Sequence, residues 1–324
     1  MKLIVTGGAG FIGSNFIRHI FSKYPNYEIV NLDLLTYAGG LDNLKDVDSR
    51  HNYEFIKGDI GDKDLTDKLA KQADIIVNFA AETHVDRSIS NSFDFINTNV
   101  VGTHNLLESA KNNNKIRFHH ISTDEVYGHL GLEDDPFNES TKYDPRSPYS
   151  ASKAASDHLV MSYYHTYGLP VTISNCSNNY GPYQFPEKLH ALFITNLLEG
   201  KKVPLYGDGL NIRDWLFVED HCEAIDRIIH HGRIGETYCI GGGCEKTNLE
   251  VVYEILKLLG MNDNMIEYIN DRPGHDRRYA MSYKKMKQEL EWKPNTDFSN
   301  GMIKTVEWYK KNQEWWMKRK SNIK

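Results

Sequence analysis

The chain has 324 residues, with 38 Lys or Arg and 44 Asp or Glu, which gives a formal net charge of −6 at pH 7. This charge gives no overall attraction to nucleic acid or to an anionic membrane surface, so we expect neither as a partner. The mean hydropathy is −0.55, and no apolar run approaches the roughly 18 residues that a membrane-spanning helix needs.

The cysteines, histidines and first residues limit the kind of protein further. The four cysteines lack C-x-x-C spacing and the 14 histidines are scattered, so we expect reduced thiols, no metal site and a cytoplasmic protein. We expect no cleaved signal peptide, because the first predicted strand begins at Lys2.

The chain opens with a short apolar strand (residues 3–5), a glycine-rich turn and an amphipathic helix (residues 11–21). The turn holds Gly7, Gly10 and Gly13 in the spacing G-x-x-G-x-x-G. Gly7 allows a tight turn, Gly10 lets backbone N–H groups approach a pyrophosphate, and Gly13 lets the helix pack closely against the strand. This context predicts a dinucleotide-binding site, and the alternative is a glycine-rich turn that binds nothing.

Asp33 ends the second predicted strand (residues 28–33) and lies 20 residues after Gly13. An acid at this place is expected to bind the ribose hydroxyls of adenosine. It would also repel a 2′-phosphate, which favours NAD over NADP. The loop over residues 34–40 could then close over the adenosine.

The third predicted strand covers residues 53–60 and ends in Asp59 and Ile60. Two interpretations of Asp59 stay open. It accepts a hydrogen bond from the adenine amino group, with Ile60 against the ring, or it caps the helix predicted over residues 62–71.

Strands and helices continue to alternate along the next hundred residues. Further strands are predicted over residues 74–81, 116–122 and 168–174. Between them lie a long helix over residues 90–112 and a helix with Ser147 as its N-cap and Pro148 at its first position. This order predicts an α/β fold with a doubly wound parallel (Rossmann) sheet, in which ligands bind at the carboxyl ends of the strands.

Tyr149 and Lys153 lie four residues apart on the helix that begins at Pro148, so they share a face. An ammonium beside a phenol stabilises the phenolate, which predicts a lowered pKa for Tyr149. Such a tyrosine is a usable general base for an alcohol that nicotinamide oxidises. The alternative is a chance pair on a helical surface.

The fifth predicted strand ends in Thr123, Asp124 and Glu125. A hydroxyl here can orient a substrate oxygen, but simple hydride transfer does not need two adjacent carboxyl groups. Asp124 and Glu125 together indicate separate acid and base roles, with environments that separate their pKa values. The alternative is a polar turn after the strand.

The chain changes character beyond Cys176, where it becomes irregular, polar and aromatic and then mostly helical. We expect strands over residues 215–218 and 237–240 that return to or flank the first domain. Helices are predicted over residues 248–260, 282–289 and 300–316, followed by a short basic, solvated tail. The expected division is interleaved. Residues 1–175 plus about 214–243 form the NAD-binding domain, and about 176–213 plus 244–324 form a smaller, mostly helical C-terminal substrate lobe.

Basic side chains of this second lobe could bind a diphosphate through bidentate contacts. They are Lys188, Arg213, Arg272, Arg277 and Arg278. An anionic substrate of an acidic protein needs such a local basic pocket, whereas the alternative is a surface cluster of salt bridges.

These motifs resemble those of the extended short-chain dehydrogenases/reductases that act on nucleotide sugars, and most closely those of the dTDP-glucose 4,6-dehydratase family. The similarity covers nearly the whole chain. It runs through residues 6–14, 35–38, 80–88, 122–128, 149–153, 177–188, 213–215 and 271–279. Thr-Asp-Glu at 123–125 and Asp-Arg-Pro-Gly-His at 271–275 are the specific motifs, because the whole superfamily shares the glycine turn and the Tyr-Lys pair.

The resemblance implies a lyase that converts dTDP-glucose to dTDP-4-keto-6-deoxyglucose on one tightly bound NAD, which is recycled in each turnover. Tyr149 would take the proton of the sugar 4-hydroxyl while Thr123 orients the C4 oxygen. Glu125 would remove the C5 proton, and Asp124 would protonate the departing C6 hydroxyl. Lys153 would contact the nicotinamide ribose.

The resemblance also implies two sets of binding residues and a homodimer formed through two helices of the NAD-binding domain. The implied NAD site comprises Gly7, Gly10, Phe11, Ile12, Gly13, Asp33, Leu34, Thr36, Asp59, Ile60, Ala80, Ala81, Thr98, Tyr149, Lys153 and Asn179. The implied substrate site comprises Thr83, Thr123, Asn178, Glu187, Lys188, Leu189, Arg213, Asn248, Arg272, His275 and Tyr279.

The chain departs from the family pattern at His190-Ala191, where Ile-Pro is common, and at Thr83, where serine is common. The first departure bears on how the base and pyrophosphate are held. Alternatives are a dehydratase for a UDP-, CDP- or GDP-linked sugar, a UDP-sugar epimerase or decarboxylase, and an inactive NAD-sensing regulator. Neither an epimerase nor a decarboxylase needs an acid at Asp124, and a regulator needs no catalytic set.

Overall fold

The computed structural model describes residues 1–271 and 275–321, and its centre is a seven-stranded sheet in the order β10-β6-β5-β4-β1-β2-β3. Its strands are β1 (Lys2–Thr6), β2 (Glu28–Asp33), β3 (Tyr53–Lys57), β4 (Ile75–Asn78), β5 (Arg117–Thr123), β6 (Val171–Cys176) and β10 (Glu236–Ile240). Every pairing in this sheet is parallel, which confirms the predicted fold class. The strand order reverses beside β1, where doubly wound folds bind their ligands.

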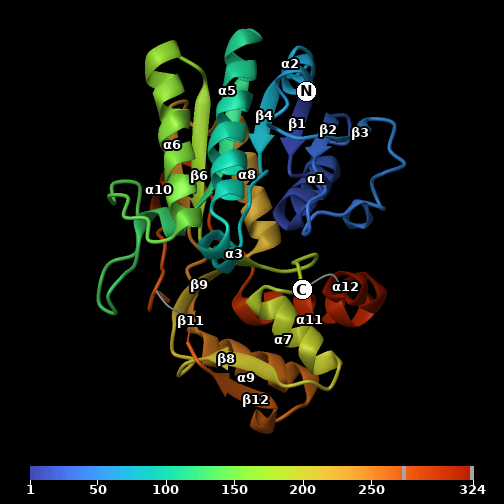
Figure 1. Cartoon of the computed structure of the whole chain (residues 1–324), viewed down its shortest axis with the longest axis vertical. Coiled ribbons are helices and arrows are strands. Elements are labelled where there is room, and N and C mark those ends of the chain that lie inside the picture. Colours follow the sequence, from blue (N-terminus) through green and yellow to red (C-terminus); the bar gives the residue numbers. More distant parts are fainter. Residues whose placement is uncertain (272–274, 322–324) are drawn as a thin grey trace.

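Helices cover both faces of this sheet, which forms the upper part of Figure 1. They are α1 (Phe11–Lys23), α8 (Val218–His231) and α10 (Lys284–Leu290) on one face, and α2 (Lys63–Ala70), α5 (Thr103–Asn112) and α6 (Pro148–Tyr167) on the other. Alternate strand residues face opposite sides. Leu3 and Val5 therefore pack under α1 and α8, whereas Ile4 packs with α5 and α6.

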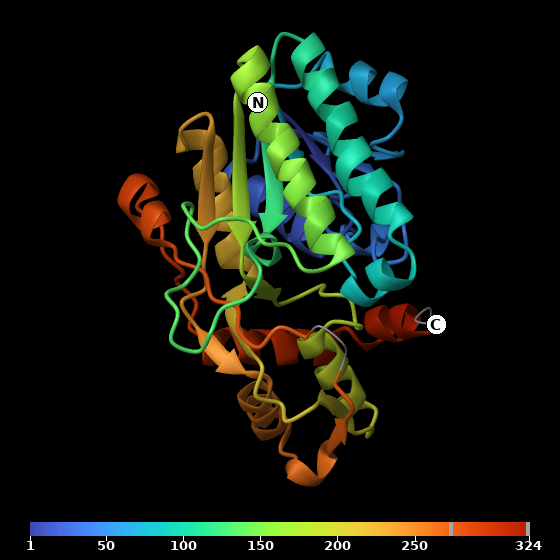
Figure 2. The ribbon, with the colours of Figure 1, turned by 60° about the vertical axis from the view of Figure 1, so that its left-hand side comes forward.

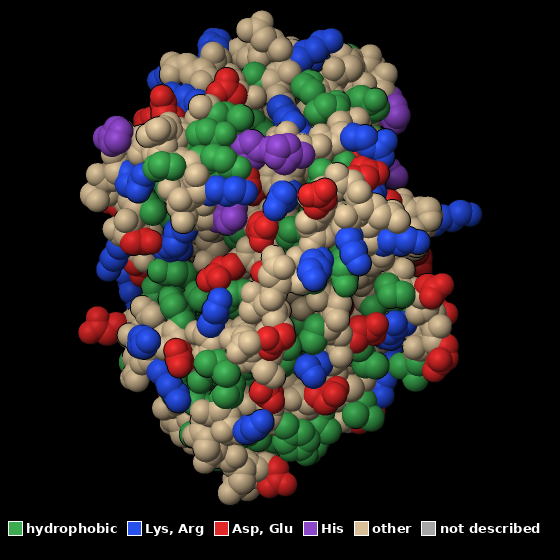
Figure 3. All heavy atoms as spheres, turned by 180° about the vertical axis from the view of Figure 1, so that it is seen from behind, with side chains coloured by type: hydrophobic (Ala, Val, Ile, Leu, Met, Phe, Trp, Pro, Cys, Tyr) green, Lys and Arg blue, Asp and Glu red, His purple; other side chains and the backbone are tan. Residues whose placement is uncertain are grey.

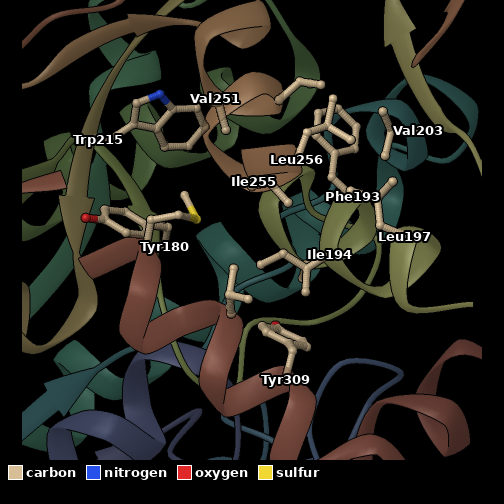
Figure 4. Packing of buried hydrophobic residues seen from close by; sticks show 14 of the residues in the cluster. Tyr180, Phe193, Ile194, Leu197, Val203, Trp215, Val251, Ile255, Leu256 and Tyr309 are labelled. Carbon is tan, nitrogen blue, oxygen red and sulfur yellow. The ribbon is translucent and has the colours of Figure 1, made fainter. Parts of the chain in front are cut away.

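The second lobe lies below the sheet in Figure 1 and has its own core. Its elements are β7 (Asn178–Tyr180), α7 (Leu189–Leu198), β8 (Val203–Tyr206), β9 (Ile212–Phe217), β11 (Glu245–Thr247), α9 (Asn248–Leu259), β12 (Ile266–Ile269), α11 (Phe298–Lys311) and α12 (Gln313–Lys320). Figure 4 shows Ile194 of α7, Ile255 of α9 and Tyr309 of α11 converging in that core, with Trp215 and Tyr180 at its edge.

The predicted long helix over residues 90–112 is wrong in part. The structure has α3 (Val85–Ser90), α4 (Phe93–Phe95), a π-helical stretch (Ile96–Gly102) and then α5. Asn91 leaves the helical conformation, with φ −146° and ψ 90°, which separates α3 from α4. In the π-helical stretch the buried Asn99 side chain accepts from the Glu82 N–H and donates to the Ser152 hydroxyl, and the neighbouring Thr98 lines the cavity described below.

Three elements near the C-terminus also differ from expectation. The predicted strand at 215–218 is β9, but it pairs with β7 and β11 and not with the main sheet, and Val218 begins α8. The predicted helix at 282–289, assigned to the second lobe, is α10 and packs on β10 and α8. The basic tail is not wholly solvated in its described part, residues 318–321, because Arg319 is buried. Two short 3₁₀ turns, Leu41–Asn43 and Asp263–Met265, complete the described elements outside the site.

The surface and the helices carry two further observations. Figure 3 shows acidic and basic side chains interspersed over the back of the molecule. Within residues 1–271 and 275–321, every helix is too short or too polar to cross a membrane.

A buried carboxylate joins α1 to α8. Asp226 is 1% exposed and contacts three side chains, which are Lys23 Nζ at 2.6 Å, His230 Nδ1 at 2.8 Å and His19 Nε2 at 3.0 Å. Burial alone would raise the pKa of Asp226, but the hydrogen bonds from these three groups hold it well below its usual range. The bond to Asp226 in turn raises the pKa of His230.

We expect Asp226→Asn to lower the free energy of unfolding by about 2 kcal/mol, as for a lost hydrogen bond to a charged group. The Asp226 carboxylate is ionised at every pH above its lowered pKa. His230 stabilises the fold while it is protonated, and this stability is lost as the pH rises through the raised pKa of His230. The difference in free energy of unfolding between the parent and Asp226→Asn should therefore be largest in mildly acidic buffer. Urea unfolding across pH measures it, and equal differences in acid and alkali would exclude the His230 contribution.

Candidate active site at the carboxyl ends of the strands

A cavity opens at the carboxyl ends of the sheet strands, between the sheet and the second lobe. All sixteen residues of the predicted NAD set line it, which are Gly7, Gly10, Phe11, Ile12, Gly13, Asp33, Leu34, Thr36, Asp59, Ile60, Ala80, Ala81, Thr98, Tyr149, Lys153 and Asn179. All five predicted catalytic residues line the same cavity. The structure thus brings together residues that are up to 172 positions apart in the sequence.

The glycine turn brings the start of α1 to the cavity. Gly7 has φ +67°, and a Cβ there would lie 2.6 Å from the backbone nitrogen of Ala80, which follows the end of β4. A Cβ on Gly13 would lie 2.5 Å from the Gly7 oxygen, so both positions require glycine for space. No side chain caps the N-terminus of α1, which leaves its first N–H groups available to an anion. The turn therefore fits the diphosphate of a dinucleotide.

Asp33 lies beside this turn and is 8% exposed. One carboxylate oxygen accepts from the Ala9 N–H at 2.9 Å and the other from the Leu35 N–H at 2.7 Å. Burial raises the pKa of Asp33, and the two backbone hydrogen bonds oppose this effect. Each oxygen keeps a further lone pair that a ribose hydroxyl can use. This arrangement suits NAD, because a 2′-phosphate would meet a carboxylate.

The structure decides between the two interpretations of Asp59. Helix α2 is capped by Asp62, whose carboxylate accepts from the Leu65 N–H at 3.1 Å. Asp59 instead accepts from the Gly61 N–H at 2.8 Å and lines the cavity. The capping interpretation of Asp59 is therefore wrong, and its contact with adenine stays a prediction.

The acid pair lies where β5 passes into the short 3₁₀ turn Asp124–Tyr127. Asp124 is 1% exposed, and its Oδ1 accepts from the Thr123 hydroxyl at 3.1 Å. Its Oδ2 has no hydrogen-bond partner among the described residues. Burial, and then the negative charge of Glu125, raise the pKa of Asp124 to about 8. Asp124 therefore holds a proton at neutral pH and can act as an acid.

Tyr149 and Lys153 stand on α6, whose N-terminus has the predicted Ser147 cap within a full capping box. The predicted lowering of the tyrosine pKa is wrong. Burial, and then the charge of Glu125, raise the pKa of Tyr149 well above its usual value. Lys153 does not reverse this, because its ammonium donates to the Ile121 carbonyl at 2.7 Å. Burial lowers the pKa of Lys153 to about 8.

The predicted substrate residues fall into two groups. Thr83, Thr123, Asn178, Glu187 and Lys188 line the cavity. Leu189, Arg213, Asn248, His275 and Tyr279 do not line it, and Arg272 lies outside the described residues.

Two members of the second group still lie beside the acid pair. The Arg213 guanidinium stacks 4.4 Å from the Tyr279 ring centre, and its charge acts on Asp124 to oppose the rise in pKa. Burial, and then the negative charge of Glu125, raise the pKa of Tyr279. His275 instead pairs with Asp271, at 2.6 Å.

The departure at His190-Ala191 lies in the core of the second lobe and not at the cavity. His190 is fully buried, stacks on Tyr180 and meets the Trp215 ring edge-on at 4.2 Å. Neither ring nitrogen has a hydrogen-bond partner among the described residues. Burial lowers the pKa of His190 to about 3, so the ring is neutral and packs as an aromatic group.

Several cavity residues were not predicted from the sequence. They include Tyr37, Glu82, Cys176, Ser177, Gln184 and Phe185. Tyr37 and Phe185 lie within segments that carry the resemblance, but each acts through a partner far away in the sequence. No local pattern could have indicated those contacts.

Comparisons with known proteins agree with this geometry. A family model described as GDP-mannose 4,6 dehydratase matches residues 4–305. The dTDP-glucose 4,6-dehydratase of Xanthomonas campestris pv. campestris (strain B100) is 52% identical over 332 residues, which cover 96% of this chain and 94% of that protein.

Two solved structures are similar over almost their whole length. The dTDP-glucose 4,6-dehydratase of Bacillus anthracis, in complex with NAD, has a TM-score of 0.93 at 52% identity and covers 98% of this chain and 99% of its own. The Streptomyces venezuelae enzyme of that name, with NAD and TDP bound, has a TM-score of 0.96 at 47% identity. It covers 98% of this chain and 100% of its own.

Proposed function

The chain belongs to the dTDP-glucose 4,6-dehydratase family, and from this premise we propose which of its residues carry out the reaction. The protein is an NAD-dependent hydro-lyase that converts dTDP-glucose to dTDP-4-keto-6-deoxyglucose. The sugar is oxidised at C4, loses water across C5 and C6, and is reduced at C6. The observation that carries our assignment of residues is the burial of Asp124 beside Glu125, with one Asp124 carboxyl oxygen lacking a hydrogen-bond partner among the described residues.

The NAD site consists of the glycine turn, Asp33 and the residues around them in the cavity. Bound NAD supplies a hydride acceptor and, in its oxidised form, a positive charge. Tyr149 then accepts the proton of the sugar 4-hydroxyl, and the Thr123 hydroxyl orients the C4 oxygen. Because burial raises the pKa of Tyr149 and the Lys153 ammonium is bonded to the Ile121 carbonyl, Tyr149 would need a further positive charge near its oxygen to act as a base, and oxidised NAD would supply one.

The acid pair performs the elimination. A ketone at C4 acidifies the C5 hydrogen, which Glu125 removes as a proton. Asp124 gives its proton to the C6 hydroxyl, which leaves as water, and its Oδ2 has no other hydrogen-bond partner among the described residues. A 4-epimerase expels no hydroxyl group and needs no such acid, so the protonated Asp124 favours dehydration over epimerisation.

The two lobes divide the work between cofactor and sugar. We propose that residues 1–175 and about 214–243 hold NAD, and that about 176–213 and 244–324 hold the nucleotide part of the substrate. The cavity supports this division, because Asn178, Glu187 and Lys188 line it opposite the sheet. Two elements depart from this division. Helix α10 belongs to the second stretch but packs on the sheet side, and most of β9 belongs to the first stretch but pairs with β7 and β11 of the second lobe.

We also propose that the protein acts in the cytoplasm. Cys176, Cys222, Cys239 and Cys244 are all free thiols, which suits a reducing compartment. Detection of the protein outside the cytoplasmic fraction of lysed cells would contradict this proposal.

We expect the purified protein to convert dTDP-glucose to a product lighter by one water without accumulating NADH. Hydride removed from C4 is returned to C6, so the cofactor shows no net change. Mass spectrometry with dTDP-, UDP-, CDP- and GDP-glucose side by side also measures the preference for the base. A product of unchanged mass would contradict dehydration, and a stronger preference for another nucleotide would contradict dTDP-glucose as substrate.

We expect Asp124→Asn to oxidise C4 but to eliminate water roughly 10² to 10⁴ times more slowly, the usual effect of losing a general acid. Reduced cofactor should then accumulate and be visible by its absorbance. In the parent, elimination should decline as the pH rises through about 8, where Asp124 loses its proton. That decline should be absent in Asp124→Asn, and unchanged turnover in the variant would remove Asp124 from the acid role.

We propose a homodimer formed through the face that carries α5 and α6, which lie side by side in Figure 2. Large apolar side chains are exposed just before α5, with Phe93 72%, Ile96 45% and Val101 50% exposed. Such a patch on a folded protein marks an interaction surface. The double variant Phe93→Ser, Val101→Ser should sediment as a monomer, whereas Tyr268→Ser on β12 should not change the mass. A parent that sediments as a monomer would contradict the proposal.

A further inference from the structure

The loop after β2 forms one wall of the cavity, and two contacts tie it to the second lobe. We call residues 34–43 the cofactor loop. Leu34, Thr36, Tyr37, Ala38 and Gly39 of this loop line the cavity. Both contacts reach across the molecule to residues that are more than a hundred positions away in the sequence.

The first contact joins Tyr37 to Glu187. The Tyr37 hydroxyl donates to Glu187 Oε1 at 2.8 Å, and the Glu187 side chain is 7% exposed. The Arg87 guanidinium lies 3.6 Å from the centre of the Tyr37 ring and 3.9 Å from Glu187 Oε2. The Phe185 ring meets Tyr37 edge-on at 5.4 Å. A partly buried, charge-assisted hydrogen bond of this kind is stronger than a neutral bond in water.

The second contact joins Arg319 of α12 to Asp42 and Asn43. Arg319 is 6% exposed and donates to both carboxylate oxygens of Asp42, at 2.5 and 2.9 Å, and to Asn43 Oδ1 at 2.7 Å. The Trp315 indole donates to the same Asn43 oxygen at 2.8 Å. The bond from Arg319 lowers the pKa of Asp42, so the pair is ionised at neutral pH.

This second contact continues into the glycine turn. The Asn43 amide donates to the Ala9 carbonyl at 2.7 Å, and the Gly40 N–H donates to that carbonyl at 3.1 Å. The Ala9 N–H in turn donates to Asp33 at 2.9 Å. In Figure 1, α12 lies at the border between the lower lobe and the N-terminal part of the chain. The C-terminal helix therefore supports the residues that would hold the diphosphate and the ribose.

We propose that the Tyr37–Glu187 and Arg319–Asp42 contacts form a clasp that retains NAD between the two hydride transfers, with Tyr37 and Arg319 as positioning residues. The proposal rests on the proposed function, because the hydride taken from C4 must return to the same sugar. Loss of the reduced cofactor in between would leave an oxidised sugar that cannot be completed. Both contacts must break before the cofactor loop can move away from the second lobe.

We expect Tyr37→Phe to release NAD about ten times faster than the parent, which is the factor for one lost hydrogen bond of ordinary strength. Arg319→Met should release NAD at least as fast as Tyr37→Phe, because it loses the bonds to both Asp42 oxygens and to Asn43. The test loads each purified protein with NAD, passes it through repeated gel filtration without sugar, and measures the NAD left per chain. Tyr253→Phe and Lys310→Met are matched controls, since both residues are exposed on the second lobe. The controls should retain NAD like the parent.

The outcomes separate the clasp from the proposed function. Equal NAD release from the parent and Tyr37→Phe would overturn the clasp, even if the dehydratase assay succeeds. Normal NAD binding without dehydration would contradict the proposed function alone. If Arg319→Met fails to fold, Tyr37→Phe decides, because it removes a single oxygen atom. As a second readout, added lactate dehydrogenase and pyruvate should oxidise escaping NADH and inactivate Tyr37→Phe faster than the parent during turnover.

Discussion

The close approach of the glycine turn to the exit of β4 is the constraint on which the site depends. Gly7 and Gly13 leave so little space that a methyl group at either position would overlap backbone atoms. This contact sets the angle at which α1 leaves β1. The uncapped start of that helix therefore faces the cavity, and Asp33 is held by the Ala9 N–H of the same turn. The geometry of the cofactor site thus follows from the absence of two side chains.

Burial raises the pKa of both Asp124, the proposed acid, and Tyr149, the proposed base. It raises the pKa of Asp124 to about 8, which keeps a proton ready for a leaving hydroxyl group. It also raises the pKa of Tyr149, which opposes the role of that residue as a base. A site that holds an acid and a base in one cavity therefore needs a positive charge close to the base alone. The positive charge of oxidised NAD would supply it, and it would then join cofactor binding to activation of the proposed base.

Local patterns predicted much of the fold and of the site, and contacts across long distances limited the rest. The alternation of apolar strands with amphipathic helices was enough to predict the parallel sheet. The pair Ser147-Pro148 was enough to predict where α6 begins. The Lys153 side chain points to the Ile121 carbonyl, and the i, i+4 spacing of Tyr149 and Lys153 gives no information about that contact. The burial of Arg319 depends on Asp42, which is 277 positions away. The π-helical stretch carries the bond from Asn99 to Ser152, a contact across 53 positions that the local pattern of residues 90–112 does not contain.

The order of the chain makes the cofactor site depend on the second lobe. The chain leaves the main sheet after β6, returns once for β10 and ends with α12 against the cofactor loop. Half of the site is formed early in the sequence, but the contacts that hold its outer wall come from residues 187 and 319. Because a ligand stabilises every part that its binding requires, NAD bound in the cavity also stabilises the position of the second lobe. In our proposal, the side chains of that lobe that bind the nucleotide sugar are then held in place relative to Tyr149 and the acid pair by the same contacts that retain NAD.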